Sequence, residues 1–130
     1  MVEVRTDKLR CSVVWDRKKT PHNVADYIKG ALEFVEELVE ATNPIEYINE
    51  NSLCMEASET RYPGGSDKFV RIQLAWGGPA LEVCIDDTGD VWVEYYDWGY
   101  HLNVGVEVRD EIFRAKLANV AKDLHELFFF

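Results

Sequence analysis

Apolar residues recur at helical spacing in three parts of the chain. Thr20-Pro21 precedes the first pattern. A threonine can cap free amide groups and a proline suits the first helical position, so we expect a helix to begin there and to end at Asn43-Pro44. A second, shorter helix is expected to start at Pro44 and run through Ile48, and a third spans about Val106 to Leu127. The apolar stripe of the first helix consists of Val24, Tyr27, Ile28, Ala31, Leu32, Val35, Leu38 and Val39.

Alternation of apolar and polar residues replaces helical spacing in the middle of the chain. It predicts three antiparallel strands over 69–76, 81–86 and 91–96, with one apolar and one mixed face. Trp76 falls in phase with the apolar face of the first strand. Residues 11–15 are a candidate fourth strand, while 53–57 fit either a helix end or an edge strand. The whole chain, 1–130, therefore predicts a single α+β domain, in which a three- to four-stranded antiparallel meander packs against two or three helices.

Two turns join the central strands. Gly77-Gly78-Pro79 follows the first strand, and Asp87-Thr88-Gly89 is typical of a hairpin with glycine where a positive φ is needed. The terminal segment 128–130 holds three phenylalanines, which we expect to pack down or to lie at an interface, because free phenyl rings in water favour aggregation. A homodimer is one way to bury them.

The amino-acid composition indicates the class of protein and its cellular compartment. A chain of 130 residues with 47% hydrophobic residues is typical of a globular domain. It contains no apolar run of about 18 residues and no signal-peptide pattern, so neither a membrane span nor secretion is expected. Cys11, Cys54 and Cys84 are widely spaced and odd in number, which favours the reducing cytoplasm of a cell over a disulfide framework.

Charge is distributed unevenly along the chain. The formal net charge is −10, and two blocks contain no lysine or arginine: residues 30–60 carry eight acidic residues and residues 72–108 carry seven. Such a surface repels nucleic acid and attracts basic proteins. We therefore expect no direct binding to nucleic acid.

The first acidic block lines one ridge of the predicted first helix at a spacing of one turn. One turn rises about 5.4 Å, a spacing of the same order as that of phosphates along a nucleic-acid strand. A solvated helix face is the simpler interpretation, but it would favour mixed charges, because like charges four residues apart destabilise a helix. The absence of cations thus favours a surface that binds a basic protein.

The second acidic block is interleaved with aromatic residues. Aromatic side chains dominate protein interfaces when exposed, and we expect Tyr95 and Trp98 in the core, with Trp92 and Tyr96 left open between core and surface. The candidate partner-binding residues of both blocks are Glu33, Glu36, Glu37, Glu40, Glu82, Asp86, Asp87, Asp90, Trp92, Glu94, Tyr96 and Asp97.

Catalytic, metal and cofactor patterns are weak. Cys84 with His101 is the one thiol–base pair to consider, but a cysteine in mid-strand is usually a packing residue. The segment 86–90 fits a hairpin turn better than a calcium loop, the histidines lack zinc spacing, and the glycine pairs do not form a nucleotide loop. We therefore expect no catalytic, metal or cofactor site, and a chain that is not an enzyme.

The segment Val70–Ala80 (VRIQLAWGGPA), together with Ile85–Gly89 and Tyr96–Gly99, resembles small accessory proteins of phages and other mobile elements. The similarity covers about residues 45–127. It implies a phage-borne accessory protein, a group that includes anti-restriction and anti-CRISPR inhibitors, and it assigns no functional residue.

These observations lead to one functional hypothesis and two alternatives. The hypothesis is a non-enzymatic nucleic-acid mimic that occupies the basic channel of a host defence protein, with a CRISPR effector nuclease as the first candidate. One alternative is an immunity or antitoxin-type protein that neutralises a basic toxin. The other is a sponge for a signalling nucleotide, which would need cations such as Arg61, Lys68 or Arg71 for its phosphates.

Overall fold

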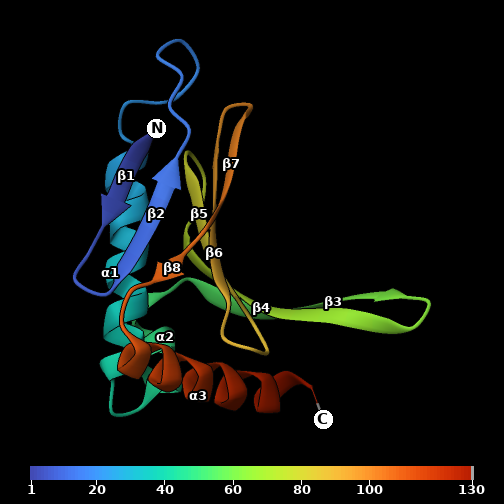
Figure 1. The fold of residues 1–130 in the computed structure, drawn as a ribbon. Helices are drawn as coiled ribbons and strands as arrows, with labels where there is room; N and C mark the ends of the chain where they lie inside the picture. Colours follow the sequence, from blue (N-terminus) through green and yellow to red (C-terminus); the bar gives the residue numbers. More distant parts are fainter. Residues whose placement is uncertain (130) are drawn as a thin grey trace.

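The structure is a computed structural model that describes residues 1–129. Over these residues the chain has an α+β fold with three helices and eight strands (Figure 1). In chain order the elements are β1 (Val2–Arg5), β2 (Leu9–Val13), α1 (Val24–Glu40), α2 (Pro44–Asn51), β3 (Cys54–Tyr62), β4 (Gly65–Ala75), β5 (Ala80–Asp86), β6 (Val91–Asp97), β7 (Tyr100–Gly105), β8 (Glu107–Val108) and α3 (Glu111–Phe128).

The strands form two antiparallel sheets. One has the order β1-β2-β8, and the other is a five-stranded meander in the order β3-β4-β5-β6-β7. The predicted α+β class and the three central strands are confirmed, but the predicted count of three to four strands is too small. The candidate strand at 11–15 is confirmed for residues 11–13, which belong to β2, and the ambiguous segment 53–57 is part of the edge strand β3 from Cys54 onward. Most of β3 is exposed, so it lacks the buried alternation that reveals the central strands.

The core lies between the five-stranded sheet and α1. Val83 and Val93 on the sheet and Leu32 and Val35 on α1 are fully buried within one hydrophobic cluster. α1 contacts strands of both sheets, and α3 packs against α1, β4 and β5. The predicted apolar stripe of α1 is therefore the surface that holds the two sheets together.

The helix starts follow the predicted rules in part. Asn43 caps α2 by accepting a hydrogen bond from the Glu46 backbone N–H at 3.1 Å. Thr20, in contrast, does not cap α1, which begins at Val24. Its hydroxyl accepts a hydrogen bond from the Asp16 backbone N–H at 2.9 Å and closes a turn before the helix. The third helix starts at Glu111 instead of near 106, because residues 107–108 pair with β2 as strand β8.

The β3–β4 hairpin extends away from the body of the molecule (Figure 1). Tyr62 pairs with Gly65, so the connection is a two-residue turn, and Gly64 has a φ of 97°, which glycine adopts readily. Phe129 stacks on His125, and Lys68, which pairs with Glu59 in the half of the hairpin nearer its turn, lies over the Phe129 ring. The expectation that the aromatic tail packs down is thus met for Phe129 but not for Phe128, which is exposed. Phe130 lies outside the described residues.

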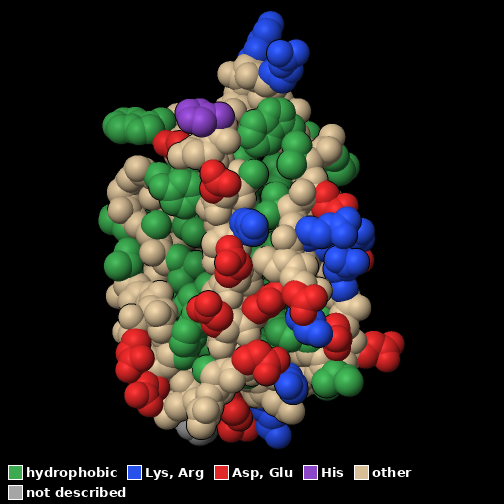
Figure 2. Space-filling model, turned by 90° about the vertical axis from the view of Figure 1, so that its left-hand side faces the viewer, with side chains coloured by type: hydrophobic (Ala, Val, Ile, Leu, Met, Phe, Trp, Pro, Cys, Tyr) green, Lys and Arg blue, Asp and Glu red, His purple; other side chains and the backbone are tan. Residues whose placement is uncertain are grey.

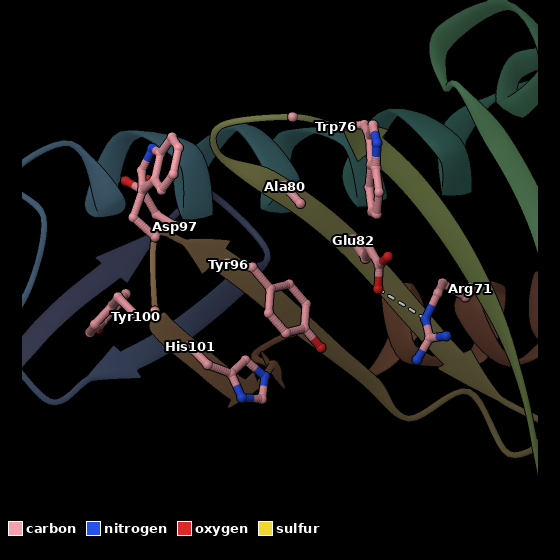
Figure 3. A pocket seen from close by; sticks show the side chains of 11 residues that line it. Arg71, Trp76, Ala80, Glu82, Tyr96, Asp97, Tyr100 and His101 are labelled. Atoms are coloured by element: carbon pink, nitrogen blue, oxygen red, sulfur yellow. Dashed lines mark ion pairs between the residues drawn. The ribbon is translucent and has the colours of Figure 1, made fainter.

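The five-stranded sheet has one face without a helix. α1 lies behind the sheet in the view of Figure 3, and no helix of residues 1–129 lies in front of it. We call this second face the open face. Its side chains alternate with those of the core along each strand, and they include Glu56, Arg71, Glu82, Cys84, Trp92, Glu94, Tyr96 and His101.

Candidate functional site

Two buried carboxylates lie at the centre of the open face. Glu82 on β5 pairs directly with Glu94 on β6, and each residue is only 8% exposed. Like charges directly opposite each other destabilise a sheet. Arg71 on the neighbouring strand β4 offsets this repulsion: its Nε lies 2.9 Å from Glu82 Oε2 and its Nη2 lies 3.4 Å from Glu94 Oε2.

This arrangement leaves negative charge uncompensated. Arg71 also contacts Glu56, with 3.5 Å between Nη1 and Oε1, so one guanidinium serves three carboxylates. Burial disfavours the charge on Arg71, but the neighbouring Glu82, Cys84 and Glu94 together outweigh it and raise the pKa of Arg71. Burial also raises the pKa of Glu82, and repulsion from Glu94 and Glu56 adds to this, so the attraction of Arg71 is not enough to reverse the shift. Glu82 is therefore an ionisable group with too little positive charge around it.

The geometry of the ion pair agrees with that conclusion. Although Arg71 Nε is 2.9 Å from Glu82, it is buried and makes no hydrogen bond to any described residue. The contact is thus a close approach of opposite charges without the aligned N–H···O geometry that makes such pairs strong.

The second carboxylate oxygen of Glu94 connects β6 with β7. Its Oε1 accepts hydrogen bonds from the Tyr96 hydroxyl at 3.2 Å and from Asn103 Nδ2 at 3.5 Å. His101 Nε2 lies 3.7 Å from the same oxygen, and its ring stacks on Tyr96 with 4.4 Å between the ring centroids and 4° between the planes. These contacts fix the orientation of the Tyr96 ring above the carboxylates.

A cavity of about 560 Å³ opens beside this group, at the end of the sheet where β6 turns into β7 (Figure 3). Its volume lies in the range of small-ligand pockets, about 300–1,000 Å³. Tyr96 and His101 stand together in front of the sheet, with Trp76 on the far side of Glu82 (Figure 3). The charged residues that line the cavity, His101 apart, are Arg71, Glu82 and Asp97, and the aromatic ones are Trp76, Tyr96, Trp98 and Tyr100.

Trp98 is presented by a strained turn. Asp97 pairs with Tyr100, so Trp98 and Gly99 form a two-residue hairpin loop, and both have positive φ (45° and 86°). This is the pattern of a type I′ turn, in which asparagine or glycine normally occupies the first position. A left-handed conformation costs an ordinary residue about 1–2 kcal/mol. Packing of the Trp98 ring offsets little of this conformational cost, because the residue is 96% exposed. The prediction that Trp98 lies in the core is wrong.

Trp76 is also on the surface. Alternation placed it with Val70, Ile72 and Leu74, but it is 72% exposed. The pairing of β4 with β5 shifts register between Gln73 and Ala75, and such a bulge breaks the two-residue period that the prediction assumed. The sequence shows no independent mark of this bulge.

The remaining aromatic predictions have clear outcomes. Tyr95 is fully buried, as predicted. Trp92 is half-buried and packs edge-on against Phe69, with 5.1 Å between the ring centroids. Tyr96 is 38% exposed and stays available to a ligand in the cavity. Of these two rings, Tyr96 lines the pocket, and Trp92 belongs to a separate cluster on the same face.

The acidic ridge of α1 lies on the covered side of the sheet, and three of its carboxylates have partners. Glu36 accepts hydrogen bonds from the Thr6 hydroxyl and from the Lys8 backbone N–H, and Glu37 accepts one from the Tyr47 hydroxyl. Glu40 lies 3.4 Å from Lys116 Nζ, while Glu33 is exposed. Acidic and basic side chains lie interspersed over the lower half of the side of the molecule shown in Figure 2. Cations distant in sequence thus supply some of the positive charge that the first acidic block lacks.

The other acidic residues of the predicted set divide between two ends of the sheet. Asp86 shapes the β5–β6 turn: its Oδ1 accepts hydrogen bonds from the Thr88 hydroxyl at 2.7 Å and from the Asp90 backbone N–H at 2.9 Å. Asp87 and Asp90 are exposed at this turn. Asp97 lies at the cavity end, where it accepts a hydrogen bond from the Tyr95 hydroxyl at 3.1 Å. The predicted residues therefore do not form one continuous surface.

The chemistry of Cys84 is that of a buried thiol. Burial, assisted by the nearby Glu94 carboxylate, raises the pKa of the Cys84 thiol to about 12 against the smaller effect of Arg71. A thiol must ionise to act as a nucleophile. Cys84 thus remains protonated near neutral pH, and His101, on the exposed side of the same face, does not change this.

Other chemistries have little support among residues 1–129. No group of three or more histidine, cysteine, aspartate or glutamate side chains there could hold a metal ion. No helix in the same part of the chain is long and apolar enough to cross a membrane. The cations named for a phosphate ligand are scattered: Arg61 pairs with Glu59, Lys68 lies over Phe129, and Arg71 is held by carboxylates. The cavity therefore suits a positively charged group better than a phosphate.

Of the predicted partner-binding residues, Glu82, Tyr96 and Asp97 line the cavity and Glu94 lies beside it. The sequence did not indicate that Arg71, Trp76 and Trp98 lie at the same place. Asp97-Trp98-Gly99-Tyr100 does fit a two-residue hairpin turn, and this signal could have placed Trp98 at a loop tip. Comparison of the chain with protein-family models, with curated proteins and with solved structures found no match.

Proposed function

We propose that this chain is a non-catalytic protein that inhibits a basic nucleic-acid-binding protein by covering its positively charged surface with the open face. The observation that carries the proposal is the shared guanidinium of Arg71, which contacts Glu56, Glu82 and Glu94 at once. A cation brought by a partner would supply the charge that this partly buried group lacks. Charge complementarity of that kind speeds association with a basic partner and disfavours other partners.

The exposed rings beside the carboxylates support a protein partner. Trp76 and Trp98 present large apolar surfaces to solvent at the rim of the cavity. Tryptophan is enriched among the residues that dominate binding energy, because it buries much area with few rotatable bonds. The strained backbone of Trp98 adds to this argument, since the turn holds a residue that is unfavourable for folding and well suited to contact.

The net charge of −10 favours a basic partner at long range. Proteins with basic channels for DNA or RNA are one class of such partners. Following the resemblance to phage accessory proteins, we propose a host defence nuclease of the CRISPR type as the first partner to test. We assign the contact to the open face and not to the α1 ridge, because Glu36, Glu37 and Glu40 already have partners within the chain.

The test is capture of partners from a lysate of the host on immobilised protein at low and at high salt, followed by mass spectrometry. We expect a basic nucleic-acid-binding protein that is released by salt and by added DNA, since the two ligands would compete for one channel. The double variant Trp76→Ala/Trp98→Asn should lose it. The control variant Ile112→Ala, which alters an exposed apolar residue on α3, should retain it.

Two outcomes would overturn the proposal. Retention of the same protein by the double variant would show that the open face is not the contact. Retention of a protein that is neither basic nor displaced by DNA would show that the partner class is wrong, and a basic toxin encoded beside this chain would favour the immunity-protein alternative.

A further inference from the structure

We propose that the cavity beside Glu82 is a receptor for one arginine side chain of the partner protein. The inference rests on the proposed function and names the chemical group that the site recognises. Its walls are the rings of Trp76, Tyr96 and Trp98, and its carboxylates are Glu82 and Asp97. Aromatic faces and carboxylates together are the surroundings in which a guanidinium binds best.

The chain itself holds one arginine in the same way. The Arg71 guanidinium carbon lies 5.2 Å from the centroid of the Phe69 ring, and the guanidinium contacts Glu82 and Glu94. The adjoining cavity repeats this combination of a ring surface and carboxylates, and Glu82 lines it as well. A second guanidinium there would face Glu82 from the side that Arg71 leaves open.

The charges of the cavity-lining residues favour a cationic ligand over an anionic or a neutral one. Arg71 is the only lysine or arginine among the cavity-lining residues, and it is shared by three carboxylates. An anion in the cavity would meet the carboxylates of Glu82 and Asp97, and a neutral apolar group would leave Glu82 with no more than its share of the Arg71 charge. A cationic group is the occupant that adds positive charge beside Glu82.

Shape favours arginine over lysine. The guanidinium is planar, weakly hydrated and able to stack on an aromatic face while it donates hydrogen bonds in the plane. A lysine ammonium is compact and strongly hydrated, so it loses more on entering an aromatic cavity. The Tyr96 ring lines the cavity and is held in one orientation by its stacking on His101, so it offers an aromatic surface to a planar group.

The experiment is a titration of the intact chain, followed by the indole N–H signals of its tryptophans in nitrogen–proton NMR spectra. The ligand is the blocked tripeptide acetyl-Gly-Arg-Gly-amide. The matched control contains citrulline, which has nearly the same shape without the charge, and a third peptide contains lysine. Trp76 and Trp98 line the cavity, whereas Trp15 does not and serves as the internal control.

We expect saturable shifts of the Trp76 and Trp98 signals with the arginine peptide and none at Trp15. The lysine peptide should bind about tenfold more weakly, and the citrulline peptide should not bind measurably. Glu82→Gln should weaken the arginine peptide about tenfold or more, while Glu33→Gln, on the other side of the sheet, should bind as the wild type does. Equal binding of citrulline, equal shifts at Trp15, or no saturable shift would each overturn the inference.

The outcome separates this inference from the proposed function. If a basic partner is captured and lost with Trp76→Ala/Trp98→Asn but the arginine peptide does not bind, the open face is a docking surface without an arginine receptor. If the peptide binds as expected but no basic protein is captured, the receptor stands and the proposed partner class fails.

Discussion

Glu82 and Glu94 lie directly opposite each other on β5 and β6, and both side chains are nine-tenths buried. A sheet built for stability alone would not place two carboxylates in this position, because each loses hydration and repels the other. Arg71 compensates in part, and it is shared with Glu56. The Glu82–Glu94 pair therefore lowers the stability of the fold, and a positively charged ligand would reduce this destabilisation.

The first prediction concerns the stability of the Glu82→Gln variant as a function of pH. The pKa of Glu82 is raised in the folded chain, chiefly by burial, from an ordinary value of 4.5. A carboxyl group with a raised folded pKa stabilises the fold below its unfolded pKa, and this contribution is lost as the pH rises through the folded pKa. At pH 7 the variant should therefore be more stable than the wild type, and the difference should shrink as the pH falls towards 4.5.

Urea unfolding at a series of pH values measures this difference. Glu33→Gln is the control, because Glu33 is exposed on α1 and should give a variant whose stability follows that of the wild type. If Glu82→Gln were less stable than the wild type at pH 7, the contact with Arg71 would outweigh the cost of burial.

The second prediction concerns the strained turn. Replacing Trp98, which has a φ of 45°, with asparagine gives the Asn-Gly sequence preferred in type I′ turns. The variant should gain about 1 kcal/mol in free energy of unfolding, because asparagine adopts the left-handed conformation at lower cost. Thermal unfolding followed by circular dichroism measures the change.

Trp76→Asn is the matched control for that experiment. Trp76 is also an exposed tryptophan at the rim of the cavity, but its φ is not positive. Its replacement should not stabilise the chain. A similar gain in both variants would mean that removal of an exposed ring, and not relief of backbone strain, is the cause.

The third prediction concerns the three thiols. Burial raises the pKa values of Cys11 and Cys84 to about 12, whereas Cys54 is exposed on the edge strand β3. Iodoacetamide at mildly alkaline pH should therefore alkylate Cys54 alone in the folded chain and all three cysteines after unfolding in urea. Peptide mass spectrometry identifies the alkylated cysteines in the folded and in the unfolded chain. Labelling of Cys84 at the rate of Cys54 would contradict the buried, protonated thiol.

The fourth prediction separates the carboxylates of the α1 ridge. Glu36 accepts hydrogen bonds from the Thr6 hydroxyl and the Lys8 backbone N–H, so Glu36→Lys should lose about 1–3 kcal/mol of stability by leaving those donors without a partner. Glu33→Lys reverses an exposed charge on the same helix and should change stability by no more than about 0.5 kcal/mol. Chemical denaturation of the two variants gives the comparison.

The same variants test the alternative hypothesis that the acidic ridge of α1 is the binding surface. Glu33→Lys should retain the captured partner, because we place the contact on the open face. Loss of the partner with Glu33→Lys at unchanged stability would indicate that the α1 ridge contacts the partner. A quadruple replacement that includes Glu36 cannot make this distinction, because it would also disturb the β1–β2 turn.

The sequence predicted the elements that are buried on one side and regular in pattern. α1, α2 and the three central strands were recognisable because burial imposes a period of 3.6 or 2 residues on the apolar positions. Asn43 revealed its helix start through local capping chemistry. By contrast, β3 has few buried residues and β8 has only two residues (Glu107–Val108), so neither strand left a periodic pattern in the sequence.

For the site, sequence alone determined the acidic character of the chain and the presence of aromatic and acidic residues in β6. Only the tertiary structure decided that Arg71 is shared by three carboxylates, since these residues come from separate strands of the meander. Strand pairing also places Trp76 on the surface, because the register of β4 and β5 shifts just before this residue. The acidic residues lie on two different faces of the sheet, which the sequence pattern did not reveal. The physical reason is that periodicity is a local property, whereas charge compensation depends on neighbours that only strand pairing and helix packing bring together.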